Sequence, residues 1–177
     1  MKKMKIFKIL FLLVLMIAIL PSNEVNAQDH NYKGYSLFIY NFIKYIEWPE
    51  DNSKGEFVIG VVGDSPIVKE LNALAAVKRA KDRPIVVKVI DISEAQNCHI
   101  VYISSAKSNS LKDMLPLVKN KSVLVIAERE GLAKKGACIN FVTLEDDTLK
   151  FELNKSVMDS HNLKIQTALL KLGLIVG

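Results

Sequence analysis

The sequence predicts one α/β domain with a mostly parallel central sheet, helices on both faces and an antiparallel strand pair late in the chain. Two observations predict this fold class. Apolar runs of strand length alternate along most of the chain with segments of helical periodicity, the pattern of a layered α/β sheet. Near the C-terminus, two strand-like segments instead flank a short acidic turn, Glu145-Asp146-Asp147, which favours a hairpin.

The first 27 residues have the pattern of a cleavable secretory signal. Four lysines precede an uncharged apolar run, residues 9–20. Pro21 begins a break before Val25 and Ala27. The run is about a dozen residues long, whereas a membrane-spanning helix needs about 20. An uncleaved anchor is the alternative. We expect cleavage between Ala27 and Gln28, and a mature domain of residues 28–177 that works outside the cytoplasm.

Loss of the signal would change the charge of the chain. The signal holds four of the 24 basic residues and one of the 19 acidic residues, so the net charge falls from +5 to +2. This near balance gives no support for a nucleic-acid-binding surface, which needs clustered Lys and Arg. The remaining 150 residues are enough for one domain that buries roughly two thirds of the surface of its unfolded chain.

The first element of the mature chain is predicted to be a helix over residues 31–47. Its core face, with residues placed at 100° intervals, holds Tyr35, Phe38, Ile39, Phe42, Tyr45 and Ile46. Trp48-Pro49 ends the helix, because a residue before proline avoids the α conformation.

Leu37 and Tyr40 are apolar residues on the otherwise polar face of this helix. They are the predicted partner or dimer interface. The alternative is that they pack beneath a loop or beneath the last helix.

The middle of the chain alternates between predicted strands and helices. Strands are expected at residues 57–63, 85–90, 99–104 and 123–127. One helix is expected to begin with Ser65 as N-cap and Pro66 as its first residue and to run to about Ala80. Another is expected over residues 110–120, where Pro116 would kink or shorten it.

The end of the chain is predicted to form the antiparallel pair, residues 138–144 and 148–153, and two helices. Phe151 and Leu153 alternate with Lys150 and Glu152, which predicts one solvent-facing side for the last strand. Asn154 is expected to cap a short helix, and residues 165–175 are expected to form a closing helix.

Cys98 and Cys138 could pair in an oxidising compartment. However, only about nine residues link the strand ending near Ala127 to the strand starting near Cys138, which suits antiparallel neighbours, because parallel strands need a longer crossover. The two cysteines would then lie at opposite ends of the sheet, beyond the roughly 7 Å Cα separation that a disulfide tolerates. We therefore predict that they are not bridged.

No set of residues in the sequence has the pattern of an enzyme. It contains neither Gly-x-Ser-x-Gly nor Gly-x-Gly-x-x-Gly, and its His, Cys, Asp and Glu residues lack metal-ligand spacing. We therefore expect no catalytic residue, no metal and no cofactor.

A protein-binding module is the first functional interpretation, and a small-ligand binding protein is the alternative. An α/β sheet offers a crevice beyond the carboxyl ends of its strands. The residues that would line that crevice are Asp64, Ser65, Ser104 and Ser105.

Several segments resemble the YfiR-like family of periplasmic proteins. The most specific is Tyr40-Asn41-Phe42-Ile43-Lys44-Tyr45-Ile46-Glu47-Trp48-Pro49, with its Phe-x-Lys-x-x-Glu-Trp-Pro string. The other similar segments are residues 57–63 with Asp64 and Pro66, residues 98–104, residues 136–142 and residues 149–154. The resemblance covers essentially all of the predicted mature chain.

The resemblance implies a non-enzymatic periplasmic regulator in cyclic-di-GMP signalling that is able to dimerise. The family's namesake represses an inner-membrane diguanylate cyclase by contacting its periplasmic sensor part, and an outer-membrane lipoprotein relieves the repression by sequestering the regulator. Such a cyclase, such a lipoprotein and a second copy are therefore the expected partners. The namesake has more cysteines than the two here, so its disulfide pattern is not carried over.

Overall fold

The computed structural model describes residues 31–49 and 55–177. The predicted signal lies outside the described residues. None of the helices in this part is long and apolar enough to cross a membrane.

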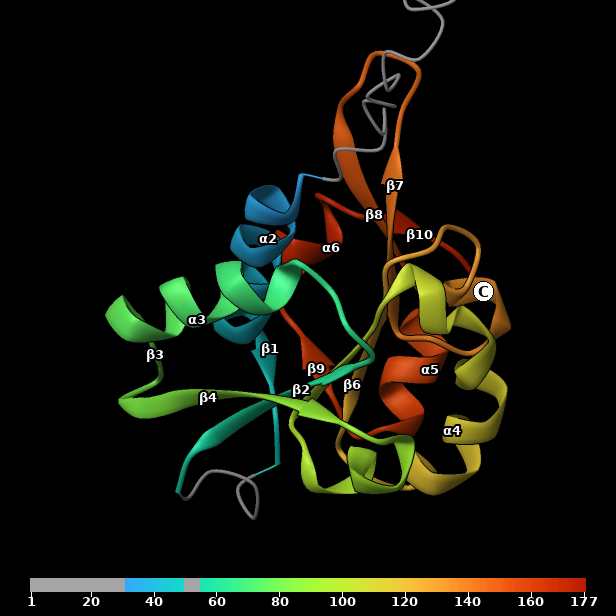
Figure 1. Cartoon of the computed structure of the whole chain (residues 1–177). Helices are drawn as coiled ribbons and strands as arrows, with labels where there is room; N and C mark the ends of the chain where they lie inside the picture. Colours follow the sequence, from blue (N-terminus) through green and yellow to red (C-terminus); the bar gives the residue numbers. More distant parts are fainter. Residues whose placement is uncertain (1–30, 50–54) are drawn as a thin grey trace, which may run out of the picture. The chain divides into compact units, whose positions relative to one another are not determined.

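The centre of the described fold is an eight-stranded sheet in the order β10-β8-β7-β6-β5-β2-β4-β3 (Figure 1). In chain order its strands are β2 (Phe57–Val62), β3 (Arg79–Ala80), β4 (Arg83–Ile90), β5 (Ile100–Ile103), β6 (Leu124–Ala127), β7 (Ile139–Thr143), β8 (Leu149–Leu153) and β10 (Leu174–Ile175). The five strands β4, β2, β5, β6 and β7 are parallel to one another, whereas β8 is antiparallel to β7. This confirms the predicted mostly parallel sheet with a late antiparallel pair.

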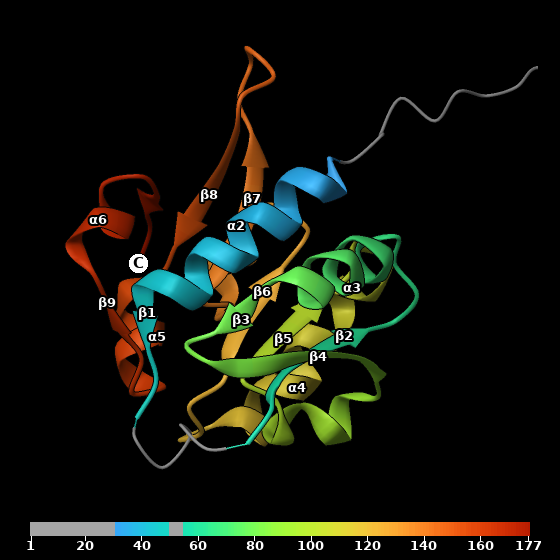
Figure 2. The same cartoon turned by 90° about the vertical axis from the view of Figure 1, so that its left-hand side faces the viewer.

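Helices cover both faces of this sheet, as predicted. They are α2 (Tyr32–Tyr45), α3 (Ile67–Val77), α4 (Leu111–Val118), α5 (Lys155–Ser160) and α6 (Thr167–Leu170), with short 3₁₀ turns η2 (Ile92–Asn97), η3 (Ser105–Ser110) and η4 (Ala133–Lys135). Figures 1 and 2 show α2 and α3 together on one face, and α4 and α5 on the other.

The aromatic face of α2 packs on the hairpin β7–β8. Phe42 is fully buried, and its ring centroid lies 5.0 Å from that of Phe151. Tyr35 stacks on Phe141 at 4.1 Å with nearly parallel rings. The predicted core face of the first helix is thus the contact between α2 and this hairpin.

This helix ends two residues earlier than predicted. Ile46 and Glu47 form a short strand, β1, that pairs antiparallel with β9 (Lys164–Ile165). Ile46 is fully buried in this pairing, so the apolar residue that looked like the last core position of a helix is a strand residue instead.

The helix predicted to run to about Ala80 is also shorter, because α3 ends at Val77 and a two-residue hairpin turn joins β3 to β4. Ser65 does not occupy the N-cap position, which Pro66 takes. The Ser65 Oγ still accepts a hydrogen bond from the Ile67 N–H at 3.4 Å.

The predicted closing helix over residues 165–175 is wrong. Those residues form the end of β9, the single turn α6 and the strand β10, which pairs parallel with β8. Their apolar spacing fits helix and strand alike. The two ends of this segment are strands rather than helix, because Ile165 pairs with β1 and residues 174–175 pair with β8.

The prediction for β8 is also wrong on one point, because Glu152 on its polar side is only 8% exposed. β10 pairs with β8 at this residue. One carboxylate oxygen of Glu152 lies 3.8 Å from the Nζ of Lys134, which belongs to η4.

Cys98 and Cys138 are both free and buried, as predicted, but the reasoning behind that prediction is wrong. β7 runs parallel to β6, with Ile126 opposite Ile139. The cysteines therefore lie at the same end of the sheet. Cys138 lies level with Val125, which pairs with Val101, three residues after Cys98. Two strand spacings of about 4.8 Å and three residues of about 3.3 Å along the strands put the Cα atoms roughly 14 Å apart, too far for a disulfide.

Candidate functional site

The two residues of the predicted interface lie on the outer side of α2 and differ in exposure. Leu37 is 54% exposed. Tyr40 is half-buried and packs against the core, with the Lys78 Nζ 5.6 Å from the centroid of its ring. Leu37 therefore offers an open apolar surface, whereas the Tyr40 ring is partly covered by Lys78, the residue after α3. Their role in an interface stays a prediction.

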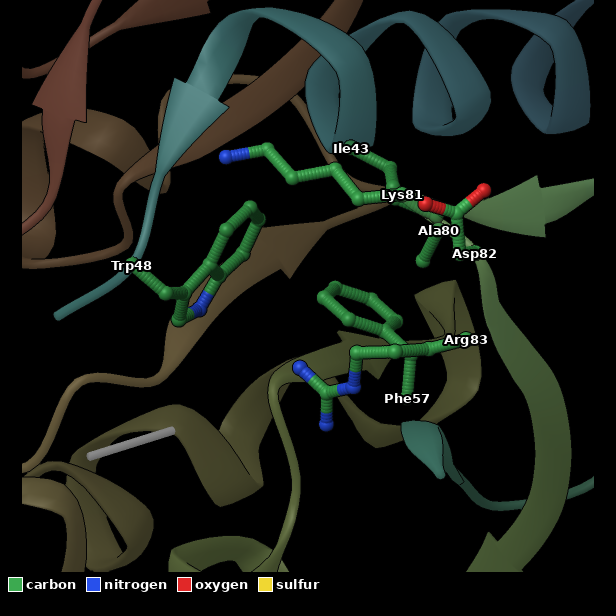
Figure 3. A pocket seen from close by; sticks show the side chains of 7 residues that line it. All are labelled: Ile43, Trp48, Phe57, Ala80, Lys81, Asp82 and Arg83. Atoms are coloured by element: carbon green, nitrogen blue, oxygen red, sulfur yellow. The ribbon is translucent and has the colours of Figure 1, made fainter. Parts of the chain in front are cut away.

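A pocket of about 250 Å³ lies beside the last turns of α2 (Figure 3). Ile43 on α2, Trp48 after β1 and Phe57 at the start of β2 line it, together with residues 80–83 of the β3–β4 hairpin. Its volume is below the roughly 300–1,000 Å³ typical of drug-sized ligand sites. The pocket is large enough for one side chain.

Two aromatic rings form the wall of this pocket. Trp48 meets Phe57 edge-on, with ring centroids 5.1 Å apart. The guanidinium carbon of Arg83 lies 5.5 Å from the Phe57 centroid, within cation–π range. Arg83 donates hydrogen bonds from Nε to the Gly55 carbonyl at 2.8 Å and from Nη2 to the Glu56 carbonyl at 2.7 Å, so backbone groups hold its guanidinium in place.

His99 supports the aromatic wall. Its ring stacks on Phe57 with centroids 4.6 Å apart, and its Nδ1 accepts a hydrogen bond from the Val58 N–H at 3.1 Å. The Trp48 Nε1–H donates to the His99 carbonyl oxygen at 3.3 Å. His99 thus joins the strands beneath the pocket. No three His, Cys, Asp or Glu residues are grouped for metal binding in residues 31–49 and 55–177.

The predicted ligand crevice lies at the point where the order of the parallel strands changes direction. β2 lies between β4 on one side and β5 on the other, and in sheets of this kind ligands bind beyond the carboxyl ends of the strands at that point. Asp64 and Ser65 follow β2, and Ser104 and Ser105 follow β5, so the fold brings all four residues to this place.

The polar groups of the crevice largely form hydrogen bonds with other groups of the protein. The Ser104 hydroxyl donates to the Val62 carbonyl at 3.1 Å, and the Ser105 N–H donates to a Glu128 carboxylate oxygen at 2.9 Å. The stem of Lys107 lies over Gly63, at the mouth of the crevice. Asp64 is exposed and borders a shallow polar hollow. Ligand binding here stays a prediction.

Glu128 is a buried charged residue that the sequence reasoning missed. It is 5% exposed, and the Tyr32 hydroxyl donates to its second carboxylate oxygen at 3.1 Å. Burial, together with the Glu128 charge, raises the pKa of Tyr35 to about 12 and raises that of Tyr102 as well. Glu128 therefore ties the first turn of α2 to the chain after β5. The signal in the sequence is an acidic residue directly after a fully apolar strand.

No curated protein matches the chain. The model of the YfiR/HmsC-like family matches residues 32–173, which include every helix and every strand of the described fold except β10. This family is one of periplasmic regulators of diguanylate cyclase signalling. The match covers most of the 177 residues, and the chain therefore belongs to the YfiR/HmsC-like family.

Proposed function

We propose that this protein is a non-enzymatic periplasmic regulator that binds and restrains the extracytoplasmic part of a membrane signalling enzyme such as a diguanylate cyclase. The observation that carries the proposal is the family match over residues 32–173, because it spans almost the whole described domain. A second copy of the chain and an outer-membrane lipoprotein are the further proposed partners.

The site geometry supports a protein-binding role. The pocket beside α2 is lined by Ile43, Trp48 and Phe57. Both ring nitrogens of the neighbouring His99 are engaged, Nδ1 by the Val58 N–H and Nε2 by the Arg83 Nη2 at 2.9 Å. The exposed Leu37 lies on the same helix as Ile43. Of these two residues only Leu37 is exposed, at 54%, and an exposed apolar side chain of this kind is what a partner protein would bury.

Export is part of the proposal, because a periplasmic partner is reached only after the chain has crossed the inner membrane, and we expect cleavage after Ala27. A deletion strain that keeps the cyclase is expected to hold more cyclic-di-GMP than the parent strain. The full-length chain should restore the parental level, with a mature mass that corresponds to residues 28–177. A chain without residues 2–27 should not restore it. An unchanged level after deletion would contradict the proposed function, and a mature mass that includes residues 1–27 would contradict the cleavage.

A further inference from the structure

The hairpin that borders the pocket is strongly basic. Residues 78–83 contain Lys78, Arg79, Lys81 and Arg83 against a single acid, Asp82. Within the described part of the chain, Lys78, Arg79 and Lys81 form no ion pair. Figure 3 shows Lys81 reaching across one side of the pocket and Arg83 across the other, both toward Trp48, while Asp82 points away.

The turn of this hairpin is conformationally unusual. Lys81 and Asp82 both have positive φ, 46° and 53°, as a two-residue turn between twisted strands requires. Gly, Asn and Asp are the residues that favour this conformation, so Asp82 suits its position, whereas a lysine at position 81 is disfavoured by about 1 kcal/mol or more. The turn places the Lys81 side chain beside the pocket.

We propose that the pocket receives one apolar or aromatic side chain from a segment of the partner protein that carries carboxylates on either side of it. Trp48, Phe57 and Ile43 would bury the apolar side chain, and Lys81 and Lys78 would meet the flanking carboxylates. The proposal rests on the proposed function for its partner and adds the chemistry of the contact. An acidic segment is favoured by charge complementarity, since Lys78, Arg79 and Lys81 have no carboxylate partner among residues 31–49 and 55–177.

An anionic membrane is the competing occupant. A membrane surface favours aromatic and basic side chains that project from the protein, whereas the Trp48 ring lies against Phe57 at the wall of a concave pocket. The pocket shape therefore favours a protein side chain.

Trp48 is the only tryptophan of the chain, so it reports directly on the pocket. The mature protein labelled with 5-fluorotryptophan should give one ¹⁹F resonance. The probes are the purified periplasmic part of the cyclase, an acidic peptide Asp-Asp-Phe-Asp-Asp, a basic peptide Lys-Lys-Phe-Lys-Lys and phosphatidylglycerol vesicles. We expect the cyclase part and the acidic peptide to shift the resonance, and the basic peptide and the vesicles to leave it unchanged.

Charge reversal provides the matched test. Lys78→Glu combined with Lys81→Glu should weaken binding of the cyclase part by about tenfold or more, and added salt should weaken the binding of the unaltered chain. Lys112→Glu, an exposed lysine on α4 at the other face of the sheet, is the control and should have little effect.

The outcomes separate the inference from the proposed function. Binding of the cyclase part that is indifferent to the Lys78 and Lys81 reversals, with an unmoved ¹⁹F resonance, overturns the pocket contact and leaves the regulatory function standing. A resonance that responds to vesicles alone overturns it in favour of a membrane surface. If neither the cyclase part nor the acidic peptide moves the resonance, the pocket contact is wrong.

Discussion

Phe42→Asp is expected to unfold the domain, whereas Tyr40→Asp, two residues earlier on the same helix, is expected to leave it folded. Phe42 is fully buried between Phe141 and Phe151, so an aspartate there would be an unpaired buried charge. That cost, added to the roughly 3–5 kcal/mol lost on removing a buried phenylalanine ring, takes most of the 5–15 kcal/mol by which a domain is stable. Tyr40 is half-buried, and the nearby Lys78 can pair with the new carboxylate.

Circular dichroism with urea unfolding of both variants measures this difference. Phe42→Ala is the control for volume without charge, and it should remain folded with a lower midpoint. Association with the cyclase part should weaken in the Tyr40→Asp variant if Tyr40 contributes to an interface. If Tyr40→Asp unfolds the protein as Phe42→Asp does, Tyr40 belongs to the core and offers no interface.

Gly63→Ala is expected to destabilise the domain more than the same change at Gly131. Both glycines have positive φ, 82° and 77°, so the backbone cost of an alanine, about 1–2 kcal/mol, is shared. A Cβ at Gly63 would lie beside the Lys107 stem and the Ser104 hydroxyl, which fill the crevice, whereas nothing lies within 4 Å of a Cβ at Gly131. Overpacking of this kind costs about 1–3 kcal/mol more.

Chemical denaturation of the two single variants gives the difference between their free energies of unfolding. Adding Lys107→Ala to Gly63→Ala should recover the part of the loss that comes from contact with the lysine stem. Equal losses at Gly63 and Gly131 would mean that Lys107 moves aside without cost and that the crevice is more open than the described contacts indicate.

Local sequence pattern predicted those helices and strands whose structure follows from their own residues. Apolar runs such as the one beginning at Phe57 predicted the buried parallel strands, and the spacing of Phe38, Phe42 and Tyr45 predicted α2. Local pattern did not predict the structure of residues that depend on contact with a segment distant in sequence. Ile46 belongs to a strand that pairs with Ile165 near the end of the chain, and Glu152 lies beside Lys134 of η4 and pairs with Leu174.

The candidate site likewise contains residues that the sequence placed together and residues that it did not. Asp64 and Ser65 follow β2, and Ser104 and Ser105 follow its parallel neighbour β5, so both pairs lie at the same edge of the sheet, while their role as a ligand site stays a prediction. The sequence does not predict the pocket beside α2, because the pocket forms only where Trp48, Phe57 and the β3–β4 hairpin come together in the fold. It does not predict the burial of Glu128 either, because nothing in one sequence shows that Tyr32 reaches this residue.

Isothermal titration of the mature chain with the purified periplasmic part of the cyclase tests the central claim most directly. A regulator that restrains the enzyme by contact should give a saturable complex with a dissociation constant of about 1 μM or tighter, and sedimentation should show one species of matching stoichiometry. Absence of heat and of a complex at about 100 μM of each protein, with both shown to be folded, would contradict the regulatory account.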